Sequence, residues 1–427
     1  MRAMKDSGIA WIGEIPEEWK IVRNKNAFVC NKELVGEKSA LTQLLSLTTR
    51  GIKKKDINNA EGKLPESFDT YQFVKENDIV MCLFDLDCSA VFSGISPIDG
   101  MISPAYRVLS CKECIEPRYA DYWFRYISDG RKFNHFAKNI RYTLSYEEFS
   151  ALPLLLPKKV EQHRIADYLD RKCSQIDAII ARQQEVIEKL KAYKLSVITE
   201  AVTKGLNPHV PMKDSGVEWI GEIPADWEVS KLKFMGHFVN GYAFSSNSFT
   251  TDGVRVMKIA NIQPMRISWI DASYVDTSEY NRLSMYRVEQ GDLVFALTRP
   301  IINGGIKVAI FDGKDKVLLN QRNAMFKGLS RVLSRWMYYV MQNQMYVQEF
   351  ALYIDATGQQ PNISTNEISQ IKIPIPPIEV QQEIIMKLDA IMASIEKLIS
   401  RKEQVIQRLS DYKKSLIYDV VTGKKEV

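Results

Sequence analysis

The chain contains 427 residues, of which 45% are hydrophobic and 26% charged, and its formal net charge is +5. This length exceeds that of one ordinary core and predicts two or three domains, and the composition excludes a largely disordered chain. No stretch has the length and hydropathy of a transmembrane helix, and the six cysteines form no framework typical of a secreted protein, so we expect a cytoplasmic protein with no membrane partner.

The first segment of the chain is repeated almost unchanged 208 residues later. Met4 to Trp19 reads MKDSGIAWIGEIPEEW and Met212 to Trp227 reads MKDSGVEWIGEIPADW, with 12 of 16 positions identical. A second repeat relates residues 162–203 to residues 381–422 at an offset of 219. The sequences between the repeated pieces differ, so the chain is a duplicated frame that contains two divergent inserts. This arrangement predicts two related recognition tasks.

Each insert mixes short apolar strands with aromatic-rich helices, which predicts an α+β domain. Asp78-Ile79-Val80 aligns with Asp292-Leu293-Val294 at an offset of 214, and both lead into a buried strand. The same offset places Tyr122-Trp123-Phe124 opposite Trp336-Met337-Tyr338 as equivalent helices. Each insert then ends in a Ser-x-x-Glu pattern that is typical of a capping box.

Basic and amide side chains concentrate where the two inserts differ most. Arg and Lys suit phosphates and guanine edges, and Asn and Gln can form paired hydrogen bonds with adenine. Any single such residue is more often a solvated surface group, so their common placement carries the hypothesis of local DNA-binding patches. The candidate DNA-binding residues are Arg50, Lys53, Lys54, Lys55, Arg107, Arg141, Tyr142, Lys258, Asn261, Arg299, Asn303, Gln321, Arg322, Gln359, Gln360 and Asn362.

A long helix follows each insert. From Val160 to Val202 the chain has no Pro or Gly, and its apolar residues follow a heptad pattern that recurs in the second copy. Lys194 and Lys413 interrupt the pattern at equivalent places, as is typical of positions that fix register. Pairing within the chain is favoured over dimerisation between chains, and the residues leave parallel and antiparallel pairing open. The candidate coil-core residues are Leu169, Ile176, Ile180, Ile187, Leu190, Leu388, Ile395, Ile399, Ile406 and Leu409.

The doubled order of frame segment, insert and long helix resembles the DNA-specificity subunit of Type I restriction–modification enzymes over essentially the whole chain. The phrases that carry the resemblance are Trp11–Pro16 with its copy Trp219–Pro224, the two Asp-Ile/Leu-Val motifs, Gly358–Asn362, and the Pro-then-Gln start of each long helix (Pro157 with Gln162, Pro376 with Gln381). The first insert departs from the pattern, because it has no clear counterpart of Gly358-Gln359-Gln360.

The resemblance implies an α+β fold in which two target recognition domains are joined by two long repeated helices. These helices would form an antiparallel coiled coil with an internal pseudo-twofold repeat. The implied divisions are a frame segment at 1–20, a first target recognition domain at 21–156, the central long helix at 157–206, a repeated frame segment at 207–228, a second target recognition domain at 229–375 and the C-terminal long helix at 376–427.

The resemblance also implies the partners of such a subunit. Each domain would read one half of a bipartite target in double-stranded DNA, and the chain would direct methyltransferase and endonuclease subunits to that target. Two methyltransferase subunits would bind, and restriction subunits with motor and nuclease activity can join them. S-adenosylmethionine, ATP and Mg²⁺ would be used by these partners, with no cofactor bound by this chain.

The residues show no catalytic motif of their own. A glycine-rich phosphate loop followed by Lys and Ser or Thr is absent from the sequence, and Asn207-Pro208-His209 departs from the Asn/Asp-Pro-Pro-aromatic motif of adenine methyltransferases. Cys111-Lys-Glu-Cys114 lacks two further zinc ligands, and the acid at Asp85 is not repeated, because its aligned partner is Arg299. We therefore expect a non-catalytic chain with no metal site.

Three alternatives stay open on the residues alone. The chain can be the specificity subunit of a methylation-only or fused methyltransferase–nuclease system, which neighbouring genes would decide. It can be an enzyme with an unrecognised site in the first insert, which predicts that Asp85→Ala or Asp87→Ala abolishes an activity of the isolated chain. It can also be a coiled-coil scaffold, which predicts no shift of any DNA duplex even in the presence of a methyltransferase partner.

Overall fold

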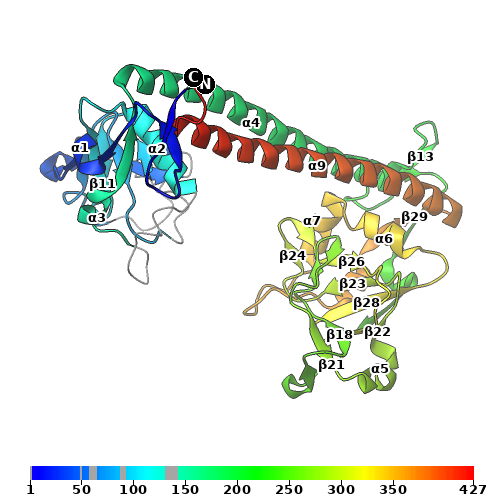
Figure 1. Cartoon of the computed structure of the whole chain (residues 1–427). Helices are drawn as coiled ribbons and strands as arrows, with labels where there is room; N and C mark the ends of the chain where they lie inside the picture. Colours follow the sequence, from blue (N-terminus) through cyan, green and yellow to red (C-terminus); the bar gives the residue numbers. More distant parts are fainter. Residues whose placement is uncertain (1, 49–50, 57–64, 87–92, 130–142) are drawn as a thin grey trace. The chain divides into compact units, whose positions relative to one another are not determined.

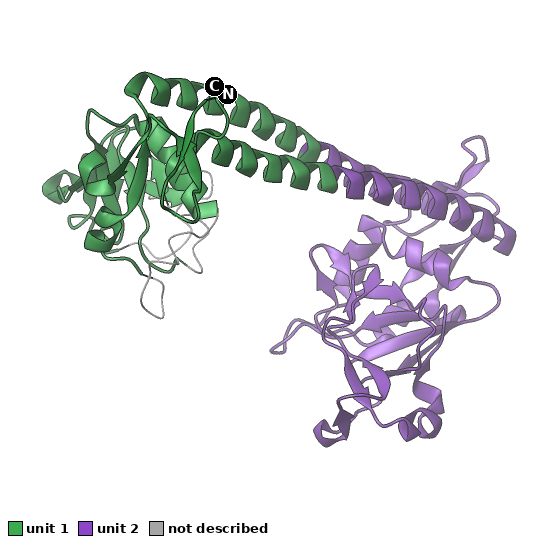
Figure 2. Ribbon diagram, in the orientation of Figure 1, with its two compact units in different colours: residues 1–184, 403–427 green, residues 185–402 purple. Residues whose placement is uncertain are grey.

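The computed structural model describes residues 2–48, 51–56, 65–86, 93–129 and 143–427. They divide into two compact units, each described here by itself (Figure 2). Unit 1 comprises residues 1–184 and 403–427, and unit 2 comprises residues 185–402. Two long helices, α4 (Lys159–Lys204) and α9 (Ile378–Val421), each contribute one part to each unit. Among the described residues, none of the helices is long and apolar enough for a membrane span.

Unit 1 contains a four-stranded antiparallel sheet and short peripheral strands. Its elements besides the long helices are β1 (Met4–Asp6), β2 (Glu14–Pro16), β3 (Lys20–Arg23), α1 (Asn24–Ala27), β4 (Phe28–Asn31), η1 (Gly36–Leu41), β5 (Leu45–Thr48), β6 (Gly51–Lys54), β7 (Gln72–Val74), β8 (Ile79–Met81), β9 (Ser93–Ile95), β10 (Gly100–Ile102), β11 (Arg107–Cys111), α2 (Pro117–Asp129), α3 (Tyr146–Ala151) and β12 (Pro153–Leu156). The sheet has the order β4-β11-β8-β9, and α2 packs against it, with the rings of Phe28 and Phe124 5.5 Å apart.

Unit 2 contains a four-stranded and a five-stranded sheet. Its elements are β13 (Met212–Asp214), β14 (Glu222–Pro224), β15 (Glu228–Lys231), η3 (Leu232–Phe234), β16 (Gly236–Asn240), η4 (Ser246–Ser248), β17 (Phe249–Thr250), β18 (Val254–Met257), β19 (Ile262–Gln263), β20 (Arg266–Ile267), β21 (Ser273–Val275), α5 (Ser278–Arg282), η5 (Ser284–Tyr286), β22 (Arg287–Val288), β23 (Leu293–Ala296), β24 (Ile301–Ile302), β25 (Gly305–Ile306), β26 (Val308–Ile310), β27 (Val317–Leu319), β28 (Asn323–Gly328), α6 (Ser334–Val340), α7 (Gln344–Leu352), α8 (Thr365–Gln370) and β29 (Lys372–Ile375). The sheets have the orders β16-β28-β23-β26 and β17-β21-β18-β27-β22. Figure 1 shows α6 between the first of these sheets and α9.

The four-stranded sheets of the two units have the same strand order, and the repeated aspartate motifs begin equivalent strands. Asp78 precedes β8 and accepts a hydrogen bond from the Lys75 N–H at 2.9 Å. Asp292 precedes β23 and accepts one from the Glu289 N–H at 2.8 Å. Each carboxylate therefore closes the turn that leads into the central strand, which is a structural reason for the repeat of this motif.

The two predicted capping boxes are confirmed. The Ser145 hydroxyl accepts from the Glu148 N–H while the Glu148 carboxylate accepts from the Ser145 N–H, at the start of α3. Ser364 and Glu367 make the same reciprocal pair at the start of α8. Both boxes satisfy backbone donors that the first helical turn leaves without partners.

The predicted alignment of the aromatic helices is wrong by three residues. The Tyr119 hydroxyl of α2 donates to the carbonyl of Leu155 at 3.0 Å, and the Trp336 indole of α6 donates to the carbonyl of Pro374 at 3.0 Å. These equivalent contacts give an offset of 217, where the sequence predicts 214. A shift of three residues is close to one helical turn and leaves aromatic residues on the same face, so the pattern does not reveal it.

Within unit 1 the two long helices are antiparallel, because the first part of α4 packs against the last part of α9. Leu169 and Ile176 of α4 share one hydrophobic core with Leu416 and Val420 of α9. The Lys413 ammonium forms an ion pair with Asp177 at 2.7 Å. The predicted antiparallel pairing is therefore confirmed in this unit.

Unit 2 repeats this packing with the roles of the helices exchanged. Here the last part of α4, including Ile198 and Val202, shares a core with Leu388 and Ile395 from the first part of α9. The Lys194 ammonium pairs with Glu396 at 2.8 Å. Lys194 and Lys413 are equivalent by the repeat, as are Glu396 and Asp177, so the interruptions of the heptad pattern are duplicated ion pairs between the helices.

Each frame segment packs on the end of a long helix. In unit 1, Ile15 and Trp19 join the core with the end of α9, and a β-carbon at Gly423 would clash with Pro16. In unit 2, the equivalent Trp227 lies beside Gly205 at the end of α4. Both glycines have positive φ angles, +73° and +76°, which end the helices and permit this close approach.

Candidate nucleic-acid interface

The loops of unit 2 that contain most of the predicted DNA-binding residues meet at one end of its sheets. β18 and β27 are parallel and both end there, and the loops 258–261 and 320–322 follow them. β23 also ends there, because it is antiparallel to β28, which begins directly after the second loop. Side chains that are distant in the sequence are therefore brought together at this end.

Backbone hydrogen bonds connect these loops to the segment before α8. The Leu297 N–H donates to the Arg322 carbonyl at 2.8 Å, and the Ile363 N–H donates to the Leu297 carbonyl at 2.9 Å. The Arg299 N–H donates to the Pro361 carbonyl at 2.8 Å. We call the resulting surface the unit 2 loop cluster, which comprises residues 258–261, 297–303, 320–322 and 355–363.

Buried polar side chains support the cluster from within. The Asn323 side chain is fully buried and donates to the Met257 carbonyl at 3.0 Å. The Lys307 ammonium is also buried and donates to the Ile259 carbonyl at 2.6 Å. Burial, with a contribution from the nearby Arg299, lowers the pKa of Lys307. These internal bonds satisfy buried polar groups and help to fix the positions of the loops.

Asn261 belongs to this internal framework. It is 1% exposed, its amide donates to the Ser268 carbonyl at 2.9 Å, and its carbonyl oxygen accepts from the Lys258 N–H at 2.8 Å. A side chain that is buried and engaged at both ends stabilises its loop. The structure therefore places this predicted DNA-binding residue beneath the surface.

Three residues of the cluster have left-handed backbone conformations. The φ angles of Arg299, Asn303 and Arg322 are 46°, 49° and 62°. Asn303 and Gly304 form the two-residue connection between β24 and β25, a position where Asn-Gly is favoured. For arginine this conformation costs about 1–3 kcal/mol, and such strain is found preferentially at functional positions.

The remaining predicted residues of unit 2 reach the surface in different degrees. Lys258 and Gln360 are half-buried. The exposed members are Arg299, Asn303, Gln321, Arg322, Gln359 and Asn362. The Asn362 amide also links the loops, because its oxygen accepts from the Thr298 hydroxyl at 2.7 Å. The cluster thus presents two guanidinium groups and several amides on one connected surface.

In unit 1 the predicted residues are less fully described. Lys53 and Lys54 lie exposed on β6, with Lys55 half-buried directly after it. Arg107 is half-buried at the start of β11, next to the end of β8. The predicted residues Arg50, Arg141 and Tyr142 lie outside the described residues.

A buried glutamine joins each insert to its long helix. In the sequence, this glutamine was noted only as part of the Pro-then-Gln motif. Gln162 accepts from the Glu116 N–H at 2.7 Å and donates to the carbonyls of Cys114 and Pro157, both at 2.9 Å. Gln381 makes the equivalent three bonds in unit 2. The glutamine of this motif therefore fixes the start of each long helix to a loop of the insert. The loop precedes α2 in unit 1 and α6 in unit 2.

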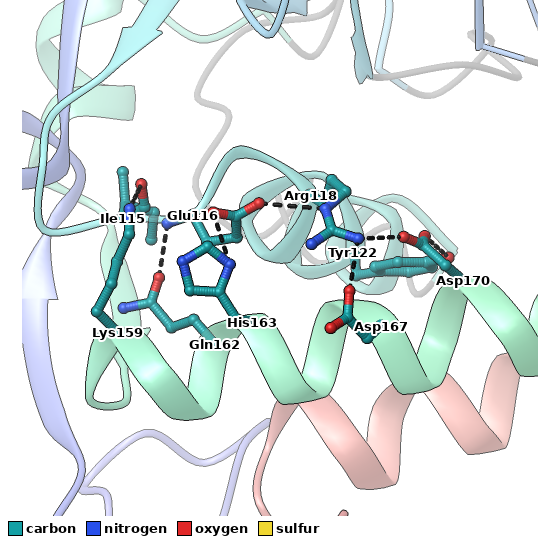
Figure 3. A network of polar contacts seen from close by, with 9 residues as sticks. All are labelled: Ile115, Glu116, Arg118, Tyr122, Lys159, Gln162, His163, Asp167 and Asp170. Carbon is teal, nitrogen blue, oxygen red and sulfur yellow. Dashed lines mark hydrogen bonds and ion pairs between the residues drawn. The ribbon is translucent and has the colours of Figure 1, made fainter.

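A charged network beside this joint was missed by the sequence analysis (Figure 3). The Arg118 guanidinium bridges Asp167 and Asp170, both at 2.8 Å, and the Tyr122 hydroxyl donates to Asp170 at 2.8 Å. Burial and the Asp170 hydrogen bond raise the pKa of Tyr122, so this phenol stays protonated. In unit 2, Arg335 pairs with Asp389 at 2.7 Å. Asp170 and Asp389 are related by the repeat offset of 219, and this relation could have identified the network from the sequence.

The structure shows the state of the CxxC pattern and of the possible metal ligands. Burial raises the pKa of Cys111 to about 12, so this member of the CxxC pattern is a neutral thiol rather than a reactive thiolate. Within residues 2–48, 51–56, 65–86, 93–129 and 143–427, His, Cys, Asp and Glu side chains form no group that could hold a metal ion.

The duplicated frame, the shared sheet order and the antiparallel helices define a class of protein built from two copies of one α+β unit. Comparisons with known proteins show what this chain is similar to. The model of the Type I restriction modification DNA specificity domain matches residues 224–408.

Relatives match most of the chain. The chain is 28% identical to the MjaVIII specificity subunit of Methanocaldococcus jannaschii, over 97% of this chain and 94% of that protein. It is 30% identical to the EcoAI specificity subunit of Escherichia coli, over 50% of this chain and 36% of that protein.

Solved structures show the same fold. A chain from a study of complex assembly and conformational transition of the type I R-M system matches with a TM-score of 0.71 and 13% identity, over 96% of this chain and 99% of that one. The HsdS subunit from Thermoanaerobacter tengcongensis matches with a TM-score of 0.51 and 14% identity, over 98% and 100%. Residues 224–408 therefore match the DNA specificity domain of Type I restriction–modification enzymes, and nearly the whole chain is similar to specificity subunits of these enzymes, so we assign it as a non-catalytic DNA-specificity subunit.

Proposed function

We propose that this chain reads a bipartite DNA target and directs methyltransferase and endonuclease subunits to it. Residues 21–156 and 229–375 are then the two target recognition domains, each of which binds one half of the target in double-stranded DNA. The partner subunits use S-adenosylmethionine, ATP and Mg²⁺, and the complex acts on DNA in the cytoplasm. The duplicated fold supports two half-sites, because one unit binds each half.

The unit 2 loop cluster is the observation that carries this proposal. Its exposed guanidinium and amide groups are the side chains that contact base edges and phosphates in DNA complexes. The cluster lies on loops fixed by buried polar groups, which is how a rigid scaffold presents adaptable binding residues. In unit 1 the exposed Lys53 and Lys54 on the β5–β6 hairpin supply phosphate-binding charge.

The test compares the methylation of genomic DNA in cells with the gene intact and with the gene deleted. Single-molecule sequencing should show loss of N6-methyladenine from one split motif, two short half-sites around a fixed spacer. A variant with Arg299, Arg322 and Gln359 all changed to alanine should lose methylation of the same motif, because it removes exposed contacts and leaves the buried framework intact.

An unchanged methylome in cells that express the partner genes would contradict the proposal. Loss of the motif on deletion, combined with full methylation in the triple variant, would keep the role of the chain and remove the unit 2 loop cluster as its DNA contact. The matched control is Lys233→Ala, which changes an exposed residue of η3. This residue lies near the start of β16, at the end of the sheet opposite the unit 2 loop cluster, so methylation should remain intact.

We propose in addition that exposed apolar residues of the long helices bind the two methyltransferase subunits. In unit 1, Ile179 of α4 and Tyr412 of α9 are 46% and 54% exposed. In unit 2, the repeat-equivalent Leu398 and Tyr193 are 43% and 57% exposed. Large apolar side chains on an ordered helix that stay exposed in the isolated chain are typical of protein interfaces. Each unit thus has one equivalent pair of exposed apolar residues, here called a patch, and two such pairs match two copies of one partner.

Changing one tyrosine should remove one partner. We expect the Tyr412→Ser chain, co-expressed with its methyltransferase subunit, to retain a single copy, because the equivalent patch at Tyr193 is intact. Native mass spectrometry measures this stoichiometry directly. The control Arg408→Ser, at another exposed position of α9, should retain two copies. Two copies bound to the Tyr412→Ser, Tyr193→Ser double variant would contradict the assignment of these patches.

A further inference from the structure

Equivalent positions of the two units have a left-handed residue of opposite charge, Asp85 in unit 1 and Arg299 in unit 2. β8 and β23 occupy the same place in sheets of the same order, and both follow the repeated aspartate turn. Seven residues beyond that aspartate, unit 1 has Asp85 with a φ of 50° and unit 2 has Arg299 with a φ of 46°. The left-handed conformation is therefore retained although the side chain has changed from an acid to a base.

The loops are also anchored in the same way. In unit 1 the Leu144 N–H donates to the carbonyl of Leu83 at 2.8 Å, and in unit 2 the Ile363 N–H donates to the carbonyl of Leu297 at 2.9 Å. Each anchor lies two residues before Asp85 or Arg299. The two residues therefore have similar φ angles and similarly anchored neighbours, and they occupy equivalent points of their units.

Both side chains are exposed and available. Among the described residues, neither the Asp85 carboxylate nor the Arg299 guanidinium has a hydrogen-bond or ion-pair partner. The Lys413 ammonium and the Arg118 guanidinium, by contrast, are held in ion pairs. A left-handed arginine is rare because its β-carbon disfavours that conformation, so its retention at an anchored, exposed point indicates a binding role.

We propose that Asp85 and Arg299 are equivalent specificity-determining residues, one for each half of the DNA target. This inference rests on the proposed function and assigns the bases that it reads. The Arg299 guanidinium donates two hydrogen bonds, which match O6 and N7 of guanine in the major groove. The Asp85 carboxylate accepts a hydrogen bond, which matches the N4 amino group of cytosine. At equivalent positions, unit 2 therefore recognises guanine and unit 1 recognises cytosine.

A contact of Arg299 with a phosphate is the competing role. Phosphate contacts contribute affinity for every sequence and carry no base preference. The carboxylate at the equivalent position argues against it, because phosphate would repel Asp85. A base edge is the one DNA group for which both residues have a suitable partner.

The experiment selects bound sequences from a library of random double-stranded oligonucleotides, using the full chain with its methyltransferase subunits. The unaltered complex, Arg299→Asp, Asp85→Arg and the control Lys233→Asp are compared. The control has the same charge change as Arg299→Asp. Lys233 lies just before the start of β16, at the end of the sheet opposite Arg299. Hydrogen exchange of each variant verifies that both units remain folded.

We expect Arg299→Asp to lose a guanine preference at one position of one half-site, by about 5-fold to 150-fold, with the other half-site unchanged. Asp85→Arg should lose a cytosine preference in the other half-site only. A third variant, Arg299→Lys, should keep part of the guanine preference because lysine can still donate to O6 and N7.

Two outcomes overturn the inference. If Arg299→Asp weakens binding to all duplexes alike and the selected motif is unchanged, Arg299 is a phosphate contact. If both variants select the original motif with the original affinity, neither residue contacts DNA. Failure of the proposed function gives a different result, because the unaltered complex would then select no motif at all.

Discussion

Replacing Trp227 by alanine is expected to lower the free energy of unfolding by about 3–5 kcal/mol. The side chain is 2% exposed, and its ring meets the ring of Trp336 edge-on at 5.6 Å. It also closes the core between the second frame segment and the end of α4, beside Gly205. The cavity left by the indole is lined by rigid neighbours and would be refilled only in part.

The loss should be confined to one unit, which hydrogen exchange of the full chain can resolve. Trp227→Ala should accelerate exchange within residues 185–402, whereas the equivalent Trp19→Ala should do so within unit 1. Trp19 additionally donates to the Glu161 carboxylate at 3.1 Å, so its loss removes a hydrogen bond as well. Trp227→Phe should cost less than Trp227→Ala. Unchanged protection in unit 2, or an equal loss in both units, would contradict this account of the frame segments.

Changing Gln381 to methionine should cost at least about 3 kcal/mol, although the two side chains have similar size. The glutamine is fully buried, accepts from the Leu333 N–H at 3.0 Å, and donates to the carbonyls of Arg331 and Pro376 at 3.0 and 2.9 Å. Methionine satisfies none of these groups. Each buried backbone group left without a partner costs about 1–3 kcal/mol.

Chemical denaturation of the full chain measures this loss, and the next residue supplies the control. Gln382 is exposed on the same turn of α9, so Gln382→Met should change the stability by less than about 0.5 kcal/mol. Equal stability of the two methionine variants would show that the buried glutamine is dispensable. It would also remove the structural reason for the Pro-then-Gln phrase.

The long helices and the pairing of their repeats could be predicted because their signal is periodic and local. The heptad pattern indicates which face is buried, and Leu169 and Leu388 are indeed fully buried. The same pattern extends to a third row that includes Ile179 and Tyr193, which the structure leaves exposed. Periodicity shows that a face is apolar, whereas only the partner determines whether it is covered.

The recognition surface could be predicted in composition but not in arrangement. The contact of Arg299 with Pro361 and that of Leu297 with Arg322 join loops that are tens of residues apart, through backbone groups that every residue has. Sequence patterns contain no information on such bonds. For the same reason Asn261 was indistinguishable from its exposed neighbours, since an amide that binds DNA and one that closes a turn are the same chemical group.

The first frame segment packs on the end of α9, the last helix of the chain, and this has a consequence for synthesis of the protein on the ribosome. Unit 2 is one continuous stretch, residues 185–402, so its whole sequence is present as soon as residue 402 has emerged. Unit 1 depends on residues 403–427, which include Leu416 and Val420 of its core. At about 5–20 residues per second, the N-terminal part of the chain waits throughout the translation of unit 2 with Leu169 and Trp19 uncovered. The part of the protein that is made first is thus the last that can fold.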